Sequence, residues 1–290
     1  MKIVTDSAAD MPAEEVQALG VTVAPLFIQF PEGGVSSADL TPDEFYARLS
    51  AMHPAIPTTA MPGTDLLART YQELGAEGEE ILSVHISSGL SGTEGVARLA
   101  ALQVAPDTAV HVWDTMTLAG GQRYQVLAAA WAARLGWDLA AIRERLAQIQ
   151  ANTEVAFTLE TLEYLARGGR IGRVQALAGT LLRIKPVIHV AHADGKYSTV
   201  AKGRTLPQAI QVLVDHLHSL YGSTPLWVAV QHGQFAEKAE VLRQGILNRL
   251  KVNKMEMLRV SPVLGVHTGP GIVGVAAVPA SLLEDLQGTA

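Results

Sequence analysis

Short apolar runs alternate with longer amphipathic segments along most of the sequence, and this alternation constrains the fold more than any other feature. The apolar runs have the length of buried strands and cover residues 3–4, 21–28, 81–86, 109–113, 155–159, 184–190, 226–230, 255–260 and 275–278. Strands that alternate with helices predict parallel sheets joined by right-handed crossovers. We therefore expect an α/β protein with mainly parallel sheets.

The amphipathic segments carry recognisable helix start and stop signals. Thr41 and Glu44 form a capping box with Pro42 at the first helical position, and Gly20 closes an earlier helix. Helical periodicity predicts helices over residues 12–19, 43–50, 65–74, 93–102, 118–135, 139–150, 206–220 and 236–250.

The length of 290 residues predicts two domains, at about 150 residues each. We place the boundary near Ala151, after two consecutive helices and before a new strand, which gives domains 1–150 and 151–290. Hydrophobic residues make up 48% of the chain and aromatic residues only 5%, so both cores are expected to be aliphatic.

Charge and composition exclude several classes of protein. The net charge of −6 argues against a nucleic-acid partner, which requires clustered Lys and Arg. The absence of cysteine excludes disulfides, thiolate nucleophiles and thiolate metal sites. There is no secretory signal, and no apolar run of about 18 residues, so we expect a cytoplasmic protein without stable membrane insertion. The Walker loop is also absent, which predicts that the chain has no ATP site of its own.

The most informative segment for function is 87–93, SSGLSGT, between a predicted strand and a predicted helix. Ligands of parallel sheets gather where strands end and helices begin, and hydroxyls with free N–H groups there suit a phosphate or a carboxylate. A turn whose serines only cap the helix explains the same residues. Spacing alone does not separate these two interpretations.

Two sharper motifs fail on inspection. The hydrolase elbow requires Gly-x-Ser-x-Gly, but Thr93 stands at the last position. The segment 269–274, GPGIVG, matches the dinucleotide fingerprint, yet a strand rather than a helix is predicted after it and no acid follows at the required distance. We therefore expect no nicotinamide or flavin cofactor.

Basic and histidine residues leave alternatives open. Arg170 follows the pair Gly168-Gly169 and belongs either to a solvated helix end or to a turn that presents guanidinium groups to an anion. His189 and His192 lie at a strand end with only Asp194 as a nearby carboxylate, so we expect no metal site. His267 lies in a stiff, glycine-rich turn after a strand and has either a structural or a binding role.

Taken together, the ordered motifs of this chain resemble the DegV family of bacterial fatty-acid-binding proteins. The matching segments are 4–7 (VTDS), 57–59 (PTT), 87–93 (SSGLSGT), 164–171 (YLARGGRI), 185–186 (KP) and 267–271 (HTGPG). They occur in the expected order from end to end, so the resemblance covers essentially the whole chain.

The resemblance implies two α/β domains that hold one long-chain fatty acid, such as palmitate, stearate or oleate, between them. It also implies a carrier that presents the carboxylate to a separate ATP-binding fatty-acid kinase subunit, which forms acyl phosphate for phospholipid synthesis. The carboxylate contacts would be Thr59, Ser91 and His267, with Gly92, Thr93 and Thr268 beside them. Arg170 would serve the surface that meets the kinase subunit. No cofactor or metal is implied.

One segment departs from the family pattern. The family usually continues its threonine as TSQPS, whereas this chain reads TAMPG over residues 59–63. Two polar residues are replaced by Ala60 and Gly63, and the glutamine by Met61. The departure predicts a less polar pocket around Thr59.

Two other functions compete with lipid carriage. A serine hydrolase of acyl esters would use Ser91 as nucleophile and His267 as base, with Asp6 or Asp114 as third member. A phosphosugar or nucleotide binder would use the same 87–93 loop, but no Lys or Arg lies beside that loop in sequence.

Overall fold

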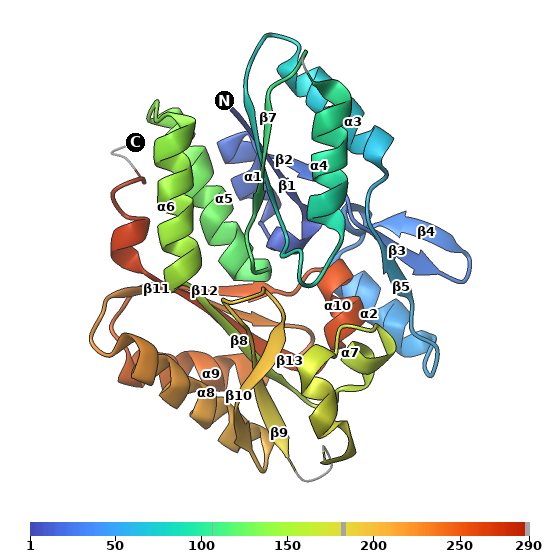
Figure 1. The fold of residues 1–290 in the computed structure, drawn as a ribbon. Helices are drawn as coiled ribbons and strands as arrows, with labels where there is room; N and C mark the ends of the chain where they lie inside the picture. Colours follow the sequence, from blue (N-terminus) through green and yellow to red (C-terminus); the bar gives the residue numbers. More distant parts are fainter. Residues whose placement is uncertain (106, 181–183, 288–290) are drawn as a thin grey trace.

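The computed structural model describes residues 1–105, 107–180 and 184–287, and contains two large sheets packed against one central helix (Figure 1). This helix, α5 (Ala119–Arg134), contacts β1 and β6 of the first sheet and β8 and β13 of the second. Within the described ranges, no helix is both long and apolar enough to cross a bilayer. The α/β class expected from the sequence is confirmed.

The first sheet is wholly parallel, in the strand order β2-β1-β6-β7. Its strands are β1 (Lys2–Asp6), β2 (Thr22–Ala24), β6 (Ile81–His85) and β7 (Val110–Asp114). The crossover helices α3 (Thr64–Gly75) and α4 (Thr93–Val104) cover one face through an aliphatic cluster, and α5 covers the other. Helix α1 (Ala13–Leu19) connects β1 to β2.

The second sheet has six strands in the order β10-β9-β8-β13-β11-β12 and is mainly antiparallel. Its strands are β8 (Glu154–Leu159), β9 (Lys185–Val190), β10 (Tyr197–Gly203), β11 (Leu226–His232), β12 (Val252–Arg259) and β13 (Ile272–Pro279). Among the described strands of this sheet, β11 and β12 are the pair that runs parallel, and α9 (Ala236–Arg249) connects them. The expectation of parallel pairing is therefore wrong for this sheet.

Two local features explain that error. Strands β9 and β10 are joined by a short turn around Gly195, and a connection this short allows only antiparallel pairing. Strand β13 lies between β8 and β11 and runs antiparallel to both. Helices α8 (Leu206–Tyr221) and α9 cover one face of this sheet, while α5 and α6 (Leu139–Asn152) lie on the other side (Figure 1).

A third, small sheet of β3 (Phe27–Phe30), β4 (Gly33–Ser36) and β5 (Thr58–Ala60) was not expected. The sequence predicts one strand over 21–28, but Pro25 lies between β2 and β3 and cannot donate to a ladder, so the segment divides between two sheets. Helix α2 (Pro42–Ala51) packs on this sheet together with the C-terminal α10 (Pro262–Thr268). The short α7 (Glu163–Arg167) packs against α10.

The composition of α5 explains how it fits between two sheets. Almost all of its residues are buried, and small side chains predominate on it. A Cβ at Gly120 would lie 2.6 Å from the Cβ of Ala276 on β13, so only glycine allows this close approach. One apolar cluster continues from the first sheet through α5 into the second. The domain boundary near residue 151 stays a prediction.

We expect the buried Arg123 of α5 to be a major determinant of stability. Its side chain is fully buried and donates hydrogen bonds to Glu15 of α1 and to Glu256 of β12 (Nη1 to Oε2, 2.9 Å). Arg123→Met removes the cation and leaves two carboxylates facing each other, which should lower the free energy of unfolding by about 3 kcal/mol in urea titrations.

The control is Arg243→Met, which removes an exposed pair with Glu240 within one helix. This change should leave the unfolding midpoint almost unchanged. Equal losses for the two variants would contradict the importance of the buried pair.

Candidate ligand-binding site

The loop 87–92 leaves the carboxyl end of β6 and is fixed by hydrogen bonds from both halves of the chain. Ser87 Oγ donates to the carbonyl of Gly195 in the β9–β10 turn (2.8 Å), and the N–H of Ser88 donates to Asp114 at the end of β7 (3.2 Å). Ser91 comes next, its Oγ 2.8 Å from Thr93 Oγ1. These contacts hold the Ser91 hydroxyl at the start of α4.

His267 lies in the last turn of α10, not in the turn that the sequence predicts. Its Nε2 is 2.9 Å from Thr59 Oγ1 on β5, a contact across 208 positions of sequence. The ring packs so closely on Gly168 that a Cβ there would lie 2.2 Å from Nδ1. The Gly168-Gly169 pair therefore gives space to the imidazole as well as ending α7.

Burial lowers the pKa of His267 to about 4, and the nearby positive charge of Arg170 contributes to the shift. The imidazole is therefore uncharged at neutral pH, with one N–H donor and one lone pair. Within the described residues, its Nδ1 has no hydrogen-bond partner. A neutral ring beside a hydroxyl is suited to hydrogen bonding with an oxygen-rich group.

Arg170 lies in the wall of the same site, although the sequence predicts a role on a partner-binding surface. Its Nη1 donates to the carbonyl of Gly168 (2.8 Å), and its Nε is 3.5 Å from the carbonyl of Leu90. The side chain is half-buried. It supplies a positive charge that the 87–93 loop lacks in its own sequence.

These residues surround a small cavity of about 40 Å³, which we call the head cavity. It is lined by Leu26, Thr59, Ile86, Leu90, Ser91, Leu118, Arg170, Tyr197, Val263, Leu264 and His267. One end carries the hydroxyl, imidazole and guanidinium groups, and the remaining wall is largely apolar.

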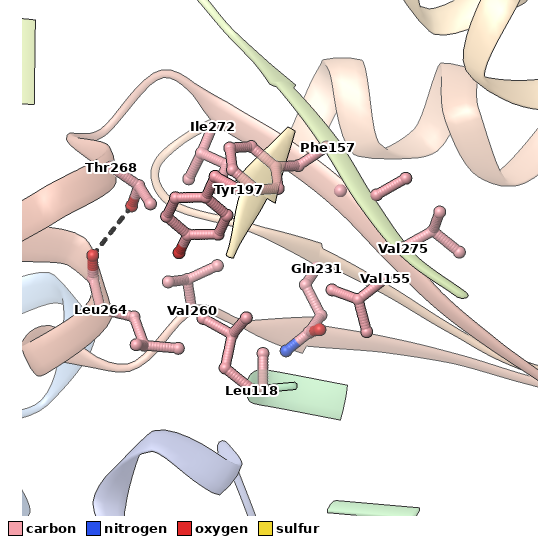
Figure 2. A pocket seen from close by; sticks show the side chains of 13 residues that line it. Leu118, Val155, Phe157, Tyr197, Gln231, Val260, Leu264, Thr268, Ile272 and Val275 are labelled. Atoms are coloured by element: carbon pink, nitrogen blue, oxygen red, sulfur yellow. Dashed lines mark hydrogen bonds between the residues drawn. The ribbon is translucent and has the colours of Figure 1, made fainter. Parts of the chain in front are cut away.

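A second cavity of similar volume, the tail cavity, lies between α5 and the second sheet (Figure 2). Its lining is almost entirely apolar: Leu118, Ala119, Val155, Ala156, Phe157, Tyr197, Gln231, Val260, Leu264, Thr268, Ile272, Gly274 and Val275. The two cavities share Leu118, Tyr197 and Leu264. The cavity with the polar groups and the apolar cavity are therefore neighbours that share part of their walls.

The one amide in the tail cavity, Gln231, is fixed by its neighbours. The N–H of Gly120 donates to its Oε1 (3.1 Å), so its Nε2 donates to Asp10 Oδ2 (2.8 Å). Burial raises the pKa of Asp10 to about 7, while hydrogen bonds from Ser261 and Gln231 oppose the shift. The amide is therefore committed to this network and is not a free donor for a ligand.

The structure brings Thr59, Ser91 and His267 to one cavity from β5, the 87–92 loop and α10. The Thr93 hydroxyl contacts that of Ser91 and is not part of the cavity lining. Gly92 packs on Met61, since a Cβ at Gly92 would lie 2.8 Å from the Met61 Sδ. Thr268 lines the tail cavity and donates to the carbonyl of Leu264 (3.1 Å; Figure 2).

Sequence reasoning missed the residues that join the two cavities. Leu118, Tyr197 and Leu264 come from three distant segments, and nothing in their local pattern marks them. Tyr197 begins β10, a strand that the sequence did not predict. The segment around it, DGKYSTVAKG over residues 194–203, is too polar to be recognised as a buried strand.

The geometry does not favour the hydrolase interpretation. Ser91 Oγ contacts Thr93 and His267 Nε2 contacts Thr59, and among the described residues no hydrogen bond joins Ser91 to His267. The Asp114 carboxylate accepts from backbone N–H groups rather than from a histidine. The contact between a nucleophile and its base that ester hydrolysis needs is therefore not formed by Ser91 and His267 in the described structure.

A series of side-chain contacts resembling a catalytic triad does occur, but it lies inside the first sheet. Asp6 Oδ2 is 2.9 Å from His85 Nδ1, and His85 Nε2 is 2.7 Å from Ser83 Oγ. All three side chains are fully buried, and Tyr71 OH caps the series at Ser83 (2.8 Å). No substrate reaches these atoms, so the network has a structural role.

This chain is similar to a known family of proteins along almost its whole length. A family model described as "Uncharacterised protein, DegV family" matches residues 1–280. The chain belongs to the DegV family. A DegV domain-containing protein of Deinococcus radiodurans is 36% identical over 278 residues, which is 96% of this chain and 95% of the relative.

Solved DegV structures have the same fold. The Thermus thermophilus DegV protein, described by its fatty acid binding, has a TM-score of 0.89 and 32% identity, covering 96% of this chain and 99% of the other. A stearic-acid-binding protein from Eubacterium ventriosum has a TM-score of 0.86 and 26% identity, covering 96% and 98%. The two-sheet architecture of this DegV chain is therefore that of its relatives.

The low pKa of His267 gives this DegV protein a specific pH dependence. The unfolded chain binds a proton at this position as the pH falls through about 6.5. The folded protein does not bind it until about pH 4. Stability conferred by the neutral ring is fully present above the unfolded pKa and is lost as the pH falls across this window.

His267→Gln should therefore flatten the dependence of the urea midpoint on pH between these two values. His53→Gln changes an exposed histidine and should leave the slope of the wild-type protein unchanged. A slope that is the same in all three proteins would show that His267 titrates normally in the folded state.

Proposed function

We propose that this protein binds one long-chain fatty acid, such as palmitate, stearate or oleate, between residues 1–150 and 151–290. The observation that carries the proposal is the head cavity, with its polar groups, beside the apolar tail cavity, with three lining residues in common. A carboxylate on a long hydrocarbon chain has the same division into one polar end and one apolar end.

The carboxylate would lie at Thr59, Ser91 and His267. Two hydroxyls and an uncharged imidazole offer donors, and hydrogen bonds to an ionised acceptor are stronger than those between neutral groups. The half-buried Arg170 adds the positive charge that a desolvated carboxylate requires. Met61 stands where the family usually has glutamine, and it packs on Gly92. The polar contacts to the carboxylate would therefore come from the two hydroxyls, the imidazole and the guanidinium group named above.

The acyl chain would supply most of the affinity. A buried methylene contributes about 0.8 kcal/mol, so about fourteen give roughly 11 kcal/mol before the costs of association. The largely apolar lining of the tail cavity suits a flexible hydrocarbon. The head group would then fix the direction in which the chain enters.

Binding requires the side chains between the cavities to move. Each cavity has a volume of about 40 Å³, whereas ligand sites usually measure about 300 Å³ or more. Leu118, Tyr197 and Leu264 belong to both walls, so they are the side chains whose rearrangement would join the two spaces. The fatty acid binding described for the Thermus thermophilus relative supports a fatty acid as the ligand.

We further propose that the protein presents the bound carboxylate to a separate ATP-dependent kinase subunit. That subunit would transfer the terminal phosphoryl group of ATP to a carboxylate oxygen, giving acyl phosphate and ADP. The lack of a Walker loop in the sequence is consistent with this division. Arg170, with its side chain in the head cavity next to the exposed Gly169, would act near the contact between the two proteins.

Native mass spectrometry of freshly purified protein tests the lipid proposal most directly. We expect one adduct per chain that denaturation releases as a fatty acid of about C16–C18 length. Protein that is empty and also fails to bind added oleate would overturn the proposal.

Variants then test the residues of the head cavity. Ser91→Ala and Thr59→Ala should each weaken oleate binding about ten-fold, because a hydrogen bond to a charged group contributes about 1.5–3 kcal/mol. The matched control is Thr70→Ala, which removes a hydroxyl that donates to the carbonyl of Leu66 within α3 (3.0 Å). Unchanged affinity in both head variants would refute the assignment of the carboxylate.

Arg170→Ala distinguishes lipid binding from kinase docking. If the guanidinium mainly meets a partner, the variant should retain its fatty acid in native mass spectra but lose acyl-phosphate formation with a bacterial fatty-acid kinase subunit and ATP. Loss of the lipid itself would instead assign Arg170 to the head cavity alone. Full phosphoryl transfer with the variant would exclude a docking role.

A further inference from the structure

One carboxylate on the outer face of the second sheet is surrounded by histidines. Glu154 begins β8, His189 lies on the neighbouring β9, and His216 comes from α8, which covers this face. The Glu154 side chain is 4% exposed, while the two imidazoles are 18% and 17% exposed. The cluster therefore lies just below the surface, with a short path to solvent.

The distances within this cluster are those of a ligand set. Glu154 Oε1 is 3.0 Å from His189 Nδ1 and 2.8 Å from His216 Nε2, and all three atoms lie within 4.8 Å of one another. Donor atoms on one tetrahedral Zn²⁺ are about 3.3 Å apart, given bonds of about 2.0–2.1 Å. The two Glu154–His distances are already close to this spacing, and the two imidazole nitrogens would have to come no more than about 1.5 Å closer together to share one ion.

The environment of Glu154 also favours a cation. Buried carboxylates are usually paired with arginine or lysine. Across the described ranges, every ion pair of Glu154 is with a histidine. An imidazole nitrogen can lose its proton and become a metal ligand, so these contacts can be exchanged for bonds to an ion in a way that contacts to arginine or lysine cannot.

We propose that Glu154, His189 and His216 bind a divalent transition-metal ion, with Zn²⁺ as the preferred ion. Two imidazoles and one carboxylate form a borderline donor set that suits Zn²⁺ and leaves the fourth position open to water. The proposal does not depend on lipid binding.

Two further residues position this ligand set. His192 Nε2 is 3.4 Å from Glu154 Oε2, the oxygen that the other two histidines do not contact, and so orients the carboxylate. The N–H of Glu154 donates to the hydroxyl of Tyr221 (2.9 Å), which fixes the start of β8. His192 is 42% exposed and borders an open hollow, which gives an ion access.

The sequence argument against a metal considered only the carboxylate close to His189 and His192. Asp194 instead pairs with Arg173 (2.9 Å). The carboxylate that meets the histidines comes from 35 positions earlier, and His216 from the following helix. Neither contact is visible before β8, β9 and α8 are packed together.

Titration of chelator-treated, full-length protein with Co²⁺ and Zn²⁺ tests the site. We expect one Zn²⁺ per chain by calorimetry, and a visible Co²⁺ spectrum of four-coordinate type that Zn²⁺ abolishes. Binding weaker than millimolar, or a Co²⁺ spectrum of the six-coordinate aqua type, would overturn the proposal.

Single variants separate ligands from neighbours. His189→Ala and His216→Ala should each weaken Zn²⁺ binding by about 100-fold or more, and His192→Ala by about 10-fold, as expected for an orienting partner. His218→Ala is the matched control, because it lies on the same helix outside the cluster and should bind Zn²⁺ as the wild type does. Equal affinity in all four variants would place the ion elsewhere and refute the site.

If a variant fails to fold, the Co²⁺ spectrum and the imidazole NMR signals of the wild-type protein still show whether the proposed residues bind the ion. Zn²⁺ should shift the ring resonances of His189 and His216 and leave those of His53 unchanged. Shifts confined to other histidines would refute the assignment.

Discussion

The burial of α5 between two sheets is the constraint on which the remaining structure depends. A helix that meets apolar partners on both sides must carry small residues where the sheets approach, and Gly120 and its alanine-rich sequence meet this need. The same helix brings Arg123 into the interior, where Glu15 and Glu256 neutralise it from opposite sides. Because Leu118 precedes this helix and lines both cavities, the packing of α5 also determines where a ligand space can form.

The chemistry of the head cavity follows from what surrounds His267. Its ring is enclosed by α10, Gly168 and Thr59, so it loses water, and Arg170 opposes its protonation. The uncharged imidazole of His267 would orient a bound anion through hydrogen bonds, and the permanently charged guanidinium group of Arg170 would neutralise its charge. Because His267 is neutral, Arg170 would be the charged member of the pair when no anion is bound.

Periodicity predicted the α/β class, most helices and the parallel first sheet, because each of these depends on local patterns of apolar residues. It did not predict the antiparallel second sheet, since strand order depends on where β13 inserts and on the unrecognised β10. The ordered motifs placed Thr59, Ser91 and His267 in one candidate site, and the fold brings them to one cavity. For Arg170 the sequence left open a turn that presents its guanidinium group to an anion, but not which cavity that turn would line. Glu154 as the partner of three histidines was not predictable, because the contacts join distant segments.

Strand β8 connects the proposed lipid site with the proposed metal site. The side chains of Val155 and Phe157 belong to the apolar cluster around α5, whereas Ala156 belongs to the cluster of the outer helices and Glu154 contacts His216 of α8, as the alternation of a strand requires. Glu154 and Val155 are adjacent, so a ligand on one face and an ion on the other would act on the same backbone segment. An ion that joins β8, β9 and α8 would restrict the movement of this segment, and an acyl chain that needs Tyr197 to move would meet a stiffer wall. Coupling between the two sites therefore has a direct physical route through one strand.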